Sequence, residues 1–206
     1  WRFDYHKHFQ LAPLGHVDDG VLYVYTSQDA DRITIHETQD GRVMVDNAGD
    51  LQRFEDVVEV VIDGGDGNDE IIIADTFTRK ATIRGGTGRD NLVSYSEGDI
   101  YFDGGADDDT LVQFGDAAVV FRGGAGDDEL IGSSGMDTLF GDAGNDRIYG
   151  DEAGTLYGTE GSSKLGDGDF IYAGDGDDLI FGQFGDDVIF GEGGTDRIFG
   201  QDGDDK

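Results

Sequence analysis

The stretch Gly123-Gly124-Ala125-Gly126-Asp127-Asp128-Glu129-Leu130-Ile131 decides the fold, because it opens a period of nine residues that recurs through the rest of the chain. Three glycines begin each copy, acidic or amide residues follow, and a large aliphatic residue stands at position eight. Later copies begin at Gly132, Gly141, Gly150 (weakened), Ala173, Gly182, Gly191 and Gly200, and single earlier copies span 64–72, 85–93 and 104–112. A repeat of this kind indicates one small unit per period, stacked on its neighbours.

The aspartates at position six show how these units stack. They lie 21, 19 and 19 residues apart at first and mostly 9 apart later. A solenoid coil of two strands and two turns needs about 18 residues, so the turn motif is expected on one side of each coil in 63–122 and on both sides in 123–206. One side would then hold Asp69, Asp90, Asp109, Asp128, Asp146, Asp169, Asp187 and Asp205, and the other Asp137, Thr155, Asp178 and Asp196. The step of 23 from Asp146 to Asp169 predicts five looped-out residues near Tyr157–Gly168.

The pattern Gly-Gly-x-Gly-x-Asp-x-U-x, where U is a large apolar residue, resembles the calcium-binding nonapeptide repeat of the RTX (repeat-in-toxin) family, of the hemolysin type. About ten copies cover residues 63–206, and a fainter copy stands at 27–34. The resemblance implies an all-β fold, a right-handed parallel β-roll or β-solenoid with calcium-binding glycine-aspartate turns. It also implies that each ion lies between a turn and the next turn on the same side, which suggests roughly eight to ten Ca²⁺ ions.

The residue types in these turns suit calcium, a hard cation that takes six to eight oxygen ligands. At position six the predicted metal ligands are Asp69, Asp90, Asp109, Asp128, Asp137, Asp146, Asp169, Asp178, Asp187, Asp196 and Asp205. At position five they are Asn68, Asp108, Asp127, Asn145, Asp177, Asp186 and Asp204. The glycines expected to turn the chain around the ions are Gly64, Gly85, Gly104, Gly123, Gly132, Gly141, Gly182 and Gly191. Weaker binding is expected where Arg89, Met136 or Thr195 stands at position five, and Asp107 replaces a fourth-position glycine.

The aliphatic residues at position eight are expected to point inward between two facing parallel sheets. They are Ile71, Leu92, Leu111, Leu130, Leu139, Ile148, Ile171, Ile180, Ile189 and Ile198. One buried aliphatic side chain per nine residues does not offset the entropy of ordering the chain, and repulsion among the aspartates adds to the deficit. We therefore expect an unfolded or molten state without calcium and folding coupled to ion binding.

Composition excludes several classes of function. With 46 acidic and 14 basic residues the net charge is −32, which excludes a nucleic-acid binder, because such proteins need basic patches for phosphates. No apolar run is long enough to span a bilayer, so no membrane insertion is expected. Cysteine is absent, which removes disulfides and thiolate chemistry. No hydrolase, zinc-protease or phosphate-loop motif occurs, and calcium turns account for the paired carboxylates, so the chain is not expected to be an enzyme.

Four regions are expected along the chain. Residues 1–20 are a leader or the remnant of a preceding region, and 21–62 form N-terminal capping strands of the solenoid. Residues 63–122 form single-sided coils, and 123–206 form a double-sided β-roll with an excursion near 157–168. Because position 1 is Trp and the last residues break off inside a repeat, we interpret the chain as a piece of a longer protein.

Three further features have competing interpretations. A His6-x-His8 pair could ligate a transition metal, but the sequence places no third ligand beside it. Aromatic residues at position nine could bind sugars, although stacking between neighbouring strands explains them better. The scarce basic residues could contact an acidic polysaccharide, although pairing with nearby acids is the simpler account. They are Arg79, Lys80, Arg84, Arg89 and Arg122.

Taken together, the sequence predicts a calcium-binding module of a large secreted or cell-surface bacterial protein of the adhesin, surface-layer or toxin type. The resemblance implies type I secretion and an extracellular location, where the module folds on meeting calcium. The alternatives are a C-terminal accessory domain of a secreted enzyme (protease, lipase or mannuronan epimerase) or a polysaccharide-binding solenoid. The expected partners are calcium ions, with a polysaccharide or neighbouring domains of the parent protein as further candidates.

Overall fold

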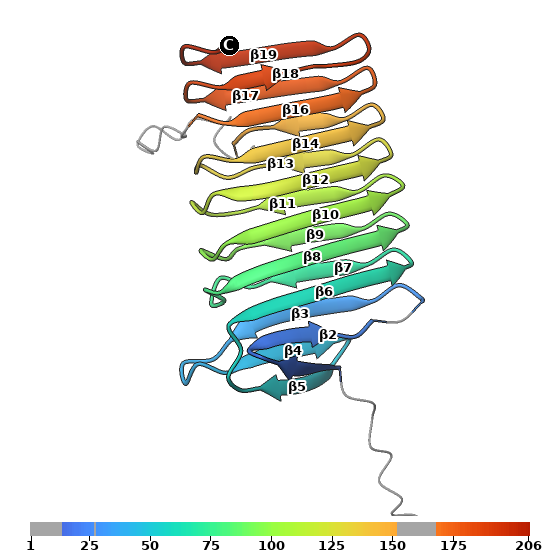
Figure 1. Cartoon of the computed structure of the whole chain (residues 1–206), viewed down its shortest axis with the longest axis vertical. Helices are drawn as coiled ribbons and strands as arrows, with labels where there is room; N and C mark the ends of the chain where they lie inside the picture. The colour runs from blue at the N-terminus through green and yellow to red at the C-terminus, as the bar shows by residue number, and fades with distance from the viewer. Residues whose placement is uncertain (1–13, 27, 152–167) are drawn as a thin grey trace, which may run out of the picture.

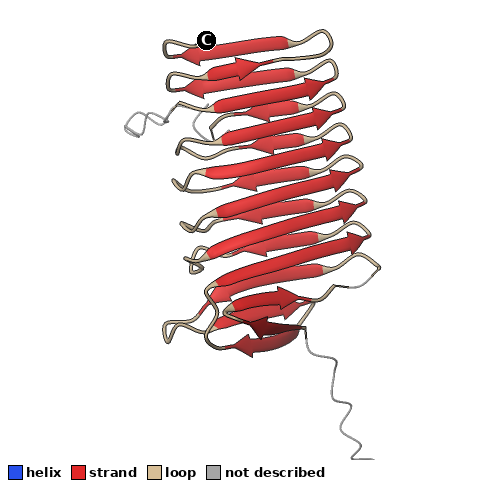
Figure 2. Cartoon of the chain, viewed as in Figure 1, coloured by secondary structure: helices blue, strands red, loops and turns tan. Residues whose placement is uncertain are grey.

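The computed structural model describes residues 14–26, 28–151 and 168–206. Every regular element within these ranges is a β-strand, and none of the described residues form a helix that could cross a membrane. The chain alternates between two facing sheets as it climbs along the long axis of the molecule (Figures 1 and 2). The all-β fold class predicted from the repeat is therefore confirmed.

The two sheets are built almost entirely from parallel strands. In spatial order, the nine-stranded sheet contains β1 (Gly15–Asp18), β2 (Val21–Val24), β6 (Glu59–Asp66), β8 (Lys80–Thr87), β10 (Ile100–Ala106), β12 (Val119–Ala125), β14 (Thr138–Ala143), β16 (Phe170–Asp175) and β18 (Val188–Phe190). The ten-stranded sheet contains β19 (Arg197–Asp202), β17 (Leu179–Phe184), β15 (Arg147–Tyr149), β13 (Glu129–Ile131), β11 (Thr110–Gln113), β9 (Asn91–Ser94), β7 (Glu70–Ile73), β3 (Arg32–Glu37), β4 (Val43–Asn47) and β5 (Asp50–Phe54). From β6 to β19 each coil adds one strand to each sheet, which makes a parallel β-solenoid of about 7 turns.

The core lies between the two sheets, where side chains from alternate strand positions meet. The predicted inward residues from Ile71 to Ile180 are fully buried, whereas Ile189 is only half-buried. Ile198 is 46% exposed, so its predicted burial is wrong. It lies on β19, an edge strand of its sheet, where fewer neighbouring strands surround each side chain.

Antiparallel strands close the N-terminal end of the solenoid. β4 and β5 extend the ten-stranded sheet as an antiparallel meander from β3, and β1 pairs antiparallel with β2 (Figure 1). The hairpin between β3 and β4 is tied to the first coil by Arg79, whose guanidinium contacts Glu37 at 2.8 Å and donates to the Gly41 carbonyl at 2.7 Å. β2 and β3 still pair parallel with β6 and β7, so the run of parallel strands ends only at β1, β4 and β5.

The register across residues 146–178 differs from the predicted one. Neighbouring strands there pair Thr138 with Phe170 and Ile148 with Ile180. That step is 32 residues, 14 more than the 18 of the next step, so the predicted loop of five residues is wrong. An insertion of 5 residues and one of 14 residues differ by nine, which is one half-coil. Both insertions therefore keep glycines and aspartates in phase, and they differ only in the sheet to which each later strand is assigned. Thr155 and all but the last residue of the predicted excursion near 157–168 lie outside the described residues.

The aromatic residues at position nine form two stacks along the solenoid, one on each sheet. Tyr172 lies between Phe140 and Phe190 with ring centroids 5.2 and 5.0 Å away. Phe181 lies between Tyr149 and Phe199 at 5.3 and 5.0 Å. Because each inner ring has its faces covered by its neighbours, the structure confirms stacking as the explanation for this pattern.

The corrected register can be tested with paired cysteines, because the chain has none of its own. Phe140 and Tyr172 are partners on adjacent strands, so F140C/Y172C is expected to form a disulfide under mild oxidation. The five-residue loop would instead have placed Tyr149 beside Tyr172, so Y149C/Y172C serves as the matched control and should stay reduced. Mass spectrometry of the oxidised protein distinguishes the two, and efficient bridging in Y149C/Y172C alone would contradict the register described here.

Candidate metal centre

The glycine-aspartate turns form two columns along opposite edges of the solenoid. The first turn column leads from the nine-stranded to the ten-stranded sheet and contains the turns 64–69, 85–90, 104–109, 123–128, 141–146, 173–178 and 191–196. The second turn column leads back and contains the turns 132–137, 182–187 and 200–205 and the connection from Gly150 to Asp169. Asp178 and Asp196 therefore lie in the first column, and Asp169, Asp187 and Asp205 in the second, the reverse of the predicted assignment.

One oxygen of each position-six carboxylate holds the preceding coil. Asp109 Oδ1 accepts a hydrogen bond from the Asp90 amide at 2.8 Å, and Asp128 Oδ1 accepts one from the Asp109 amide at 2.7 Å. In the second turn column, Asp169 Oδ1 accepts from the Asp137 amide at 2.9 Å, and Asp187 Oδ1 from the Asp169 amide at 2.9 Å. These bonds form a continuous ladder that fixes one coil on the next.

The second oxygen of most of these carboxylates is buried without a hydrogen-bond partner. The Oδ2 atoms concerned belong to Asp69, Asp90, Asp109, Asp128, Asp146, Asp169, Asp178 and Asp187, whose side chains are at most 2% exposed. Asp137 differs, because its Oδ2 accepts a hydrogen bond from the Ser133 amide at 2.5 Å. A buried carboxylate oxygen without a donor costs stability, so each of these atoms needs either a cation beside it or a proton on it.

Each of these oxygens except that of Asp178, whose turn begins with Ala173, faces a backbone carbonyl of the following coil across a first-position glycine. A Cβ atom on Gly85 would lie 2.2 Å from Asp90 Oδ2 and 2.6 Å from the Gly104 carbonyl oxygen. The same two contacts recur at Gly64, Gly85, Gly104, Gly123, Gly132, Gly141, Gly150 and Gly182. We call each such space an oxygen cradle. Two acceptors with no donor between them, in a space that only glycine leaves open, fit a hard cation such as calcium.

Backbone oxygens are an essential part of these cradles. Within the described ranges, no three His, Cys, Asp or Glu side chains gather in a way that would hold a metal ion by themselves. Calcium readily accepts backbone carbonyl ligands beside carboxylates, unlike zinc, which prefers His and Cys side chains. The carboxylate-plus-carbonyl composition therefore favours calcium, and Asp, Asn and first-position Gly are the residues that would hold it.

Burial changes the protonation of the ion-free carboxylates. Desolvation raises the pKa of Asp109 to about 8 and that of Asp169 to about 9, although an amide hydrogen bond to each acts in the opposite direction. The pKa values of Asp137 and Asp146 are raised to about 7 for the same reason. A divalent cation would stabilise the ionised forms, so ion binding and proton release are linked at these residues.

The predicted position-five residues form a second, outer ladder. Asp127 Oδ1 accepts from the Asn145 amide at 2.9 Å, and Asn145 Oδ1 accepts from the Asp177 amide at 3.0 Å. Asn68, Asp108, Asp186 and Asp204 take part in equivalent contacts. These side chains are exposed except Asp108, which is half-buried, so they surround the cradles from the solvent side.

The structure brings most predicted ligands together and adds three residues. Of the position-six aspartates, Asp196 is half-buried and Asp205 is exposed, while the others are buried. Sequence reasoning missed Gly150, which faces Asp169 and the Gly182 carbonyl, and Ala173, whose carbonyl faces Asp146. It also missed Gly200, which faces Asp205. Lys164 stands five residues before Asp169, where the other turns have glycine or alanine. This departure was the available signal that the glycine facing Asp169 lies elsewhere in the sequence.

The substitution at Asp107 leaves its turn intact. Asp107 has a φ of 76°, in the left-handed region that aspartate tolerates better than most residues. Asp109 keeps both the amide bond from Asp90 and the cradle at Gly104. The fourth-position aspartate therefore does not disrupt the cradle of its turn. The His6-x-His8 pair, in contrast, lies outside the described residues.

Comparison with known protein families matches the chain to the RTX calcium-binding nonapeptide repeat in 4 copies, over residues 60–72, 122–154 and 172–206. No curated protein and no solved structure matches the chain. The matched residues include cradles of both turn columns, whereas the cradles at Gly85 and Gly104 lie outside the match.

Replacing one position-six carboxylate by its amide should remove the need for an ion at that cradle while keeping the fold. In D128N the side-chain NH2 can donate to the Gly141 carbonyl, so the cradle is satisfied without a cation. We expect D128N to bind fewer calcium ions than the wild type and to be more stable in chelator by about 1–3 kcal/mol. Calorimetric titration and urea unfolding measure the two effects.

The matched control for that variant is D103N, because Asp103 faces outward on β10, is only half-buried and faces no cradle. It removes the same charge and should leave both the ion count and the stability in chelator nearly unchanged. An unaltered ion count in D128N would show that its cradle takes no ion.

The raised pKa values predict opposite effects of pH with and without calcium. Folding raises the pKa of Asp109 to about 8 and of Asp128 to about 6, so the ion-free fold is favoured near pH 4 and loses that stabilisation as the pH rises through these values. In the folded ion-free state these aspartates hold protons that calcium must displace, so binding to that state near pH 6 should release protons and binding near pH 10 should not. Calorimetry in buffers of different ionisation enthalpy measures this release, and its absence near pH 6 would contradict the prediction.

Proposed function

Because the chain carries RTX calcium-binding nonapeptide repeats, we propose that it is a calcium-binding β-roll that completes its folding when calcium occupies the oxygen cradles. The observation that carries this proposal is the series of buried Oδ2 atoms that face backbone carbonyls with no donor between them. Such pairs repel each other until a cation lies between them. Calcium would supply that positive charge, while the aspartates and carbonyls supply the ligands.

We further propose that the chain binds roughly eight to ten ions. Seven oxygen cradles have a carboxylate oxygen without a donor, at Gly64, Gly85, Gly104, Gly123, Gly141, Gly150 and Gly182. In the eighth, at Gly132, the Asp137 oxygen also accepts from the Ser133 amide, and together they support the lower end of this range. The buried, unpartnered Oδ2 of Asp178 supports a ninth. Because each carboxylate lies between two coils, ions in adjacent cradles are expected to bind cooperatively.

The proposed setting is outside the cell, in a secreted or surface-attached protein. Extracellular calcium modules bind at about 10⁻⁴–10⁻³ M, a range that leaves such a site empty in the cytosol and filled outside. A net charge of −32 opposes compaction without ions and so supports the same switch. Type I secretion and an adhesin, surface-layer or toxin parent remain the proposed context, with the role of accessory domain in a secreted enzyme as the alternative.

A binding role is proposed in preference to a catalytic one, and the surface offers little support for polysaccharide recognition. Four of the five basic residues considered for that role form ion pairs, namely Arg79 with Glu37, Lys80 with Glu59, Arg89 with Asp108 and Arg122 with Asp142. The aromatic rings at position nine cover one another's faces. Of these five basic residues only Arg84, which is exposed, has no ion pair within the described part of the chain, so the two sets together present few groups that an acidic sugar could use.

Far-ultraviolet circular dichroism during a calcium titration of the metal-stripped chain tests the proposal, with magnesium as the control. We expect a cooperative gain of β signal with calcium and little with magnesium, because magnesium loses its water ligands reluctantly and requires a rigid octahedral site. A β spectrum that is already complete in chelator would show that the solenoid stands without ions, and the folding switch would then be rejected.

A further inference from the structure

The outer ladder of the first turn column has an irregular member. Along this column each position-five oxygen accepts from the position-five amide of the next turn, as in Asp108 with the Asp127 amide at 3.1 Å. Asn68 accepts from the Arg89 amide in the same way, at 3.0 Å. Arg89 cannot continue the series, because a guanidinium group has donors and no acceptor. The turn 85–90 therefore contributes a positive charge where its neighbours contribute oxygens.

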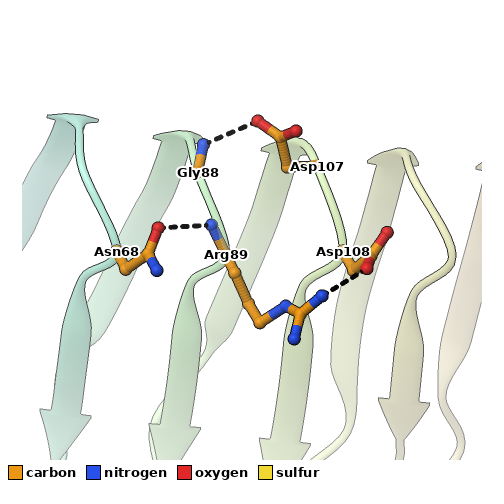
Figure 3. A pocket seen from close by; sticks show the side chains of 5 residues that line it. All are labelled: Asn68, Gly88, Arg89, Asp107 and Asp108. Carbon is orange, nitrogen blue, oxygen red and sulfur yellow. Dashed lines mark hydrogen bonds and ion pairs between the residues drawn. The ribbon is translucent and has the colours of Figure 1, made fainter.

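The Arg89 side chain reaches forward along the column to the next turn. Its Nη2 atom lies 2.5 Å from Asp108 Oδ2, and the guanidinium spans the gap between the two turns (Figure 3). In the same gap Asp107 Oδ2 accepts a hydrogen bond from the Gly88 amide at 3.1 Å. These residues and Asn68 line a pocket of about 350 Å³ that opens to solvent.

The turn that faces Arg89 carries an unusual concentration of negative charge. Asp107, Asp108 and Asp109 follow one another, and each has a contact with the turn 85–90. Beneath them, Asp90 and Asp109 each have a buried Oδ2 atom without a partner. Each of these oxygens would need a cation, and the guanidinium of Arg89, paired with Asp108, already brings a positive charge to the same two turns.

We infer that Arg89 is a resident cation that takes the place of the calcium ion at the Gly85 cradle, between the turns 85–90 and 104–109, so the wild-type chain holds one ion fewer than its cradles would allow. The inference rests on the proposed calcium-binding function and assigns one ion position of the first turn column to the Arg89 side chain. Arg89 occupies an oxygen that an ion would need and repels a second positive charge at short range. Met136 and Thr195 also stand at position five without a carboxylate or amide oxygen, but their side chains carry no charge.

The consequence is a first turn column with an interruption near its N-terminal end. The ion pair of Arg89 is well exposed, with 67% of the Arg89 side chain accessible, so it contributes little to stability by itself. Its removal should therefore leave the fold intact while freeing the Asp108 carboxylate. A calcium ion would then have access to the oxygens of three successive turns.

The test is the variant R89N, with R122N as the matched control. Asparagine already stands at position five in Asn68 and Asn145, so the turn accepts it. Arg122 also pairs with an aspartate, Asp142 at 3.1 Å, but it lies on β12 and outside the position-five ladder. Native mass spectrometry at saturating calcium counts the bound ions of each protein.

We expect R89N to hold one more calcium ion than the wild type and R122N to hold the same number as the wild type. Circular dichroism in calcium should show the same β spectrum for all three proteins. An unchanged ion count in R89N would overturn the assignment of Arg89, and so would a gain of one ion in both variants, since relief of charge alone would then explain it. A wild-type chain that binds no calcium would instead overturn the proposed function itself.

Discussion

The structure depends on two oxygen atoms that face each other across a glycine in nearly every calcium-type turn. One belongs to a position-six carboxylate, as in Asp128, and the other to the backbone carbonyl of the next coil, as in Gly141. The carboxylate cannot turn away, because its other oxygen accepts the amide of the preceding coil. The group that holds adjacent coils together thus leaves an oxygen that only a cation or a proton can satisfy. Coil stacking and the proposed ion binding are therefore coupled through the same carboxylate.

The same constraint explains why the period is strict in some places and loose in others. Where both turn columns carry carboxylates, as around Asp128 and Asp146, successive coils are 18 residues long, because every turn must meet its neighbour's oxygen. In the earlier coils the step is 19 or 21 residues. Their extra residues lie in the second turn column, which there has no carboxylate ladder. Ser96 and Gln113 hold those turns instead, through bonds of 2.7 Å to the Phe77 and Ser96 carbonyls.

The repeat was sufficient to predict the solenoid, the two facing sheets and nearly all of the buried carboxylates, since each follows from the phase between glycine, aspartate and aliphatic residue. It was insufficient for the assignment of Asp169 and Asp178 to columns. Insertions of 5 and 14 residues preserve that phase equally, and only strand pairing, such as Thr138 with Phe170, distinguishes them. The partnership of Gly150 with Asp169 was missed for the same reason, because the two are remote in sequence. The exposure of Ile198 depends on the position of its strand at a sheet edge, which a periodic pattern does not encode.

The two halves of the solenoid are held together by different interactions, so their stability is expected to depend on calcium to different extents. The early coils bury Phe77, Phe102 and Phe121, with the last two rings stacked at 5.1 Å, and ion pairs tie them to the antiparallel cap. Arg89 supplies a positive charge in that same region without any ion. Most strands of the later coils contribute one aliphatic residue to the core, such as Leu139 or Ile148, while cradles occupy both of their edges. Apolar burial therefore weakens along the chain as the number of unsatisfied oxygens rises, so the need for calcium is greatest in residues 123–206. A solenoid built in this way can keep its capped end as a template on which the ion-dependent coils add as calcium becomes available.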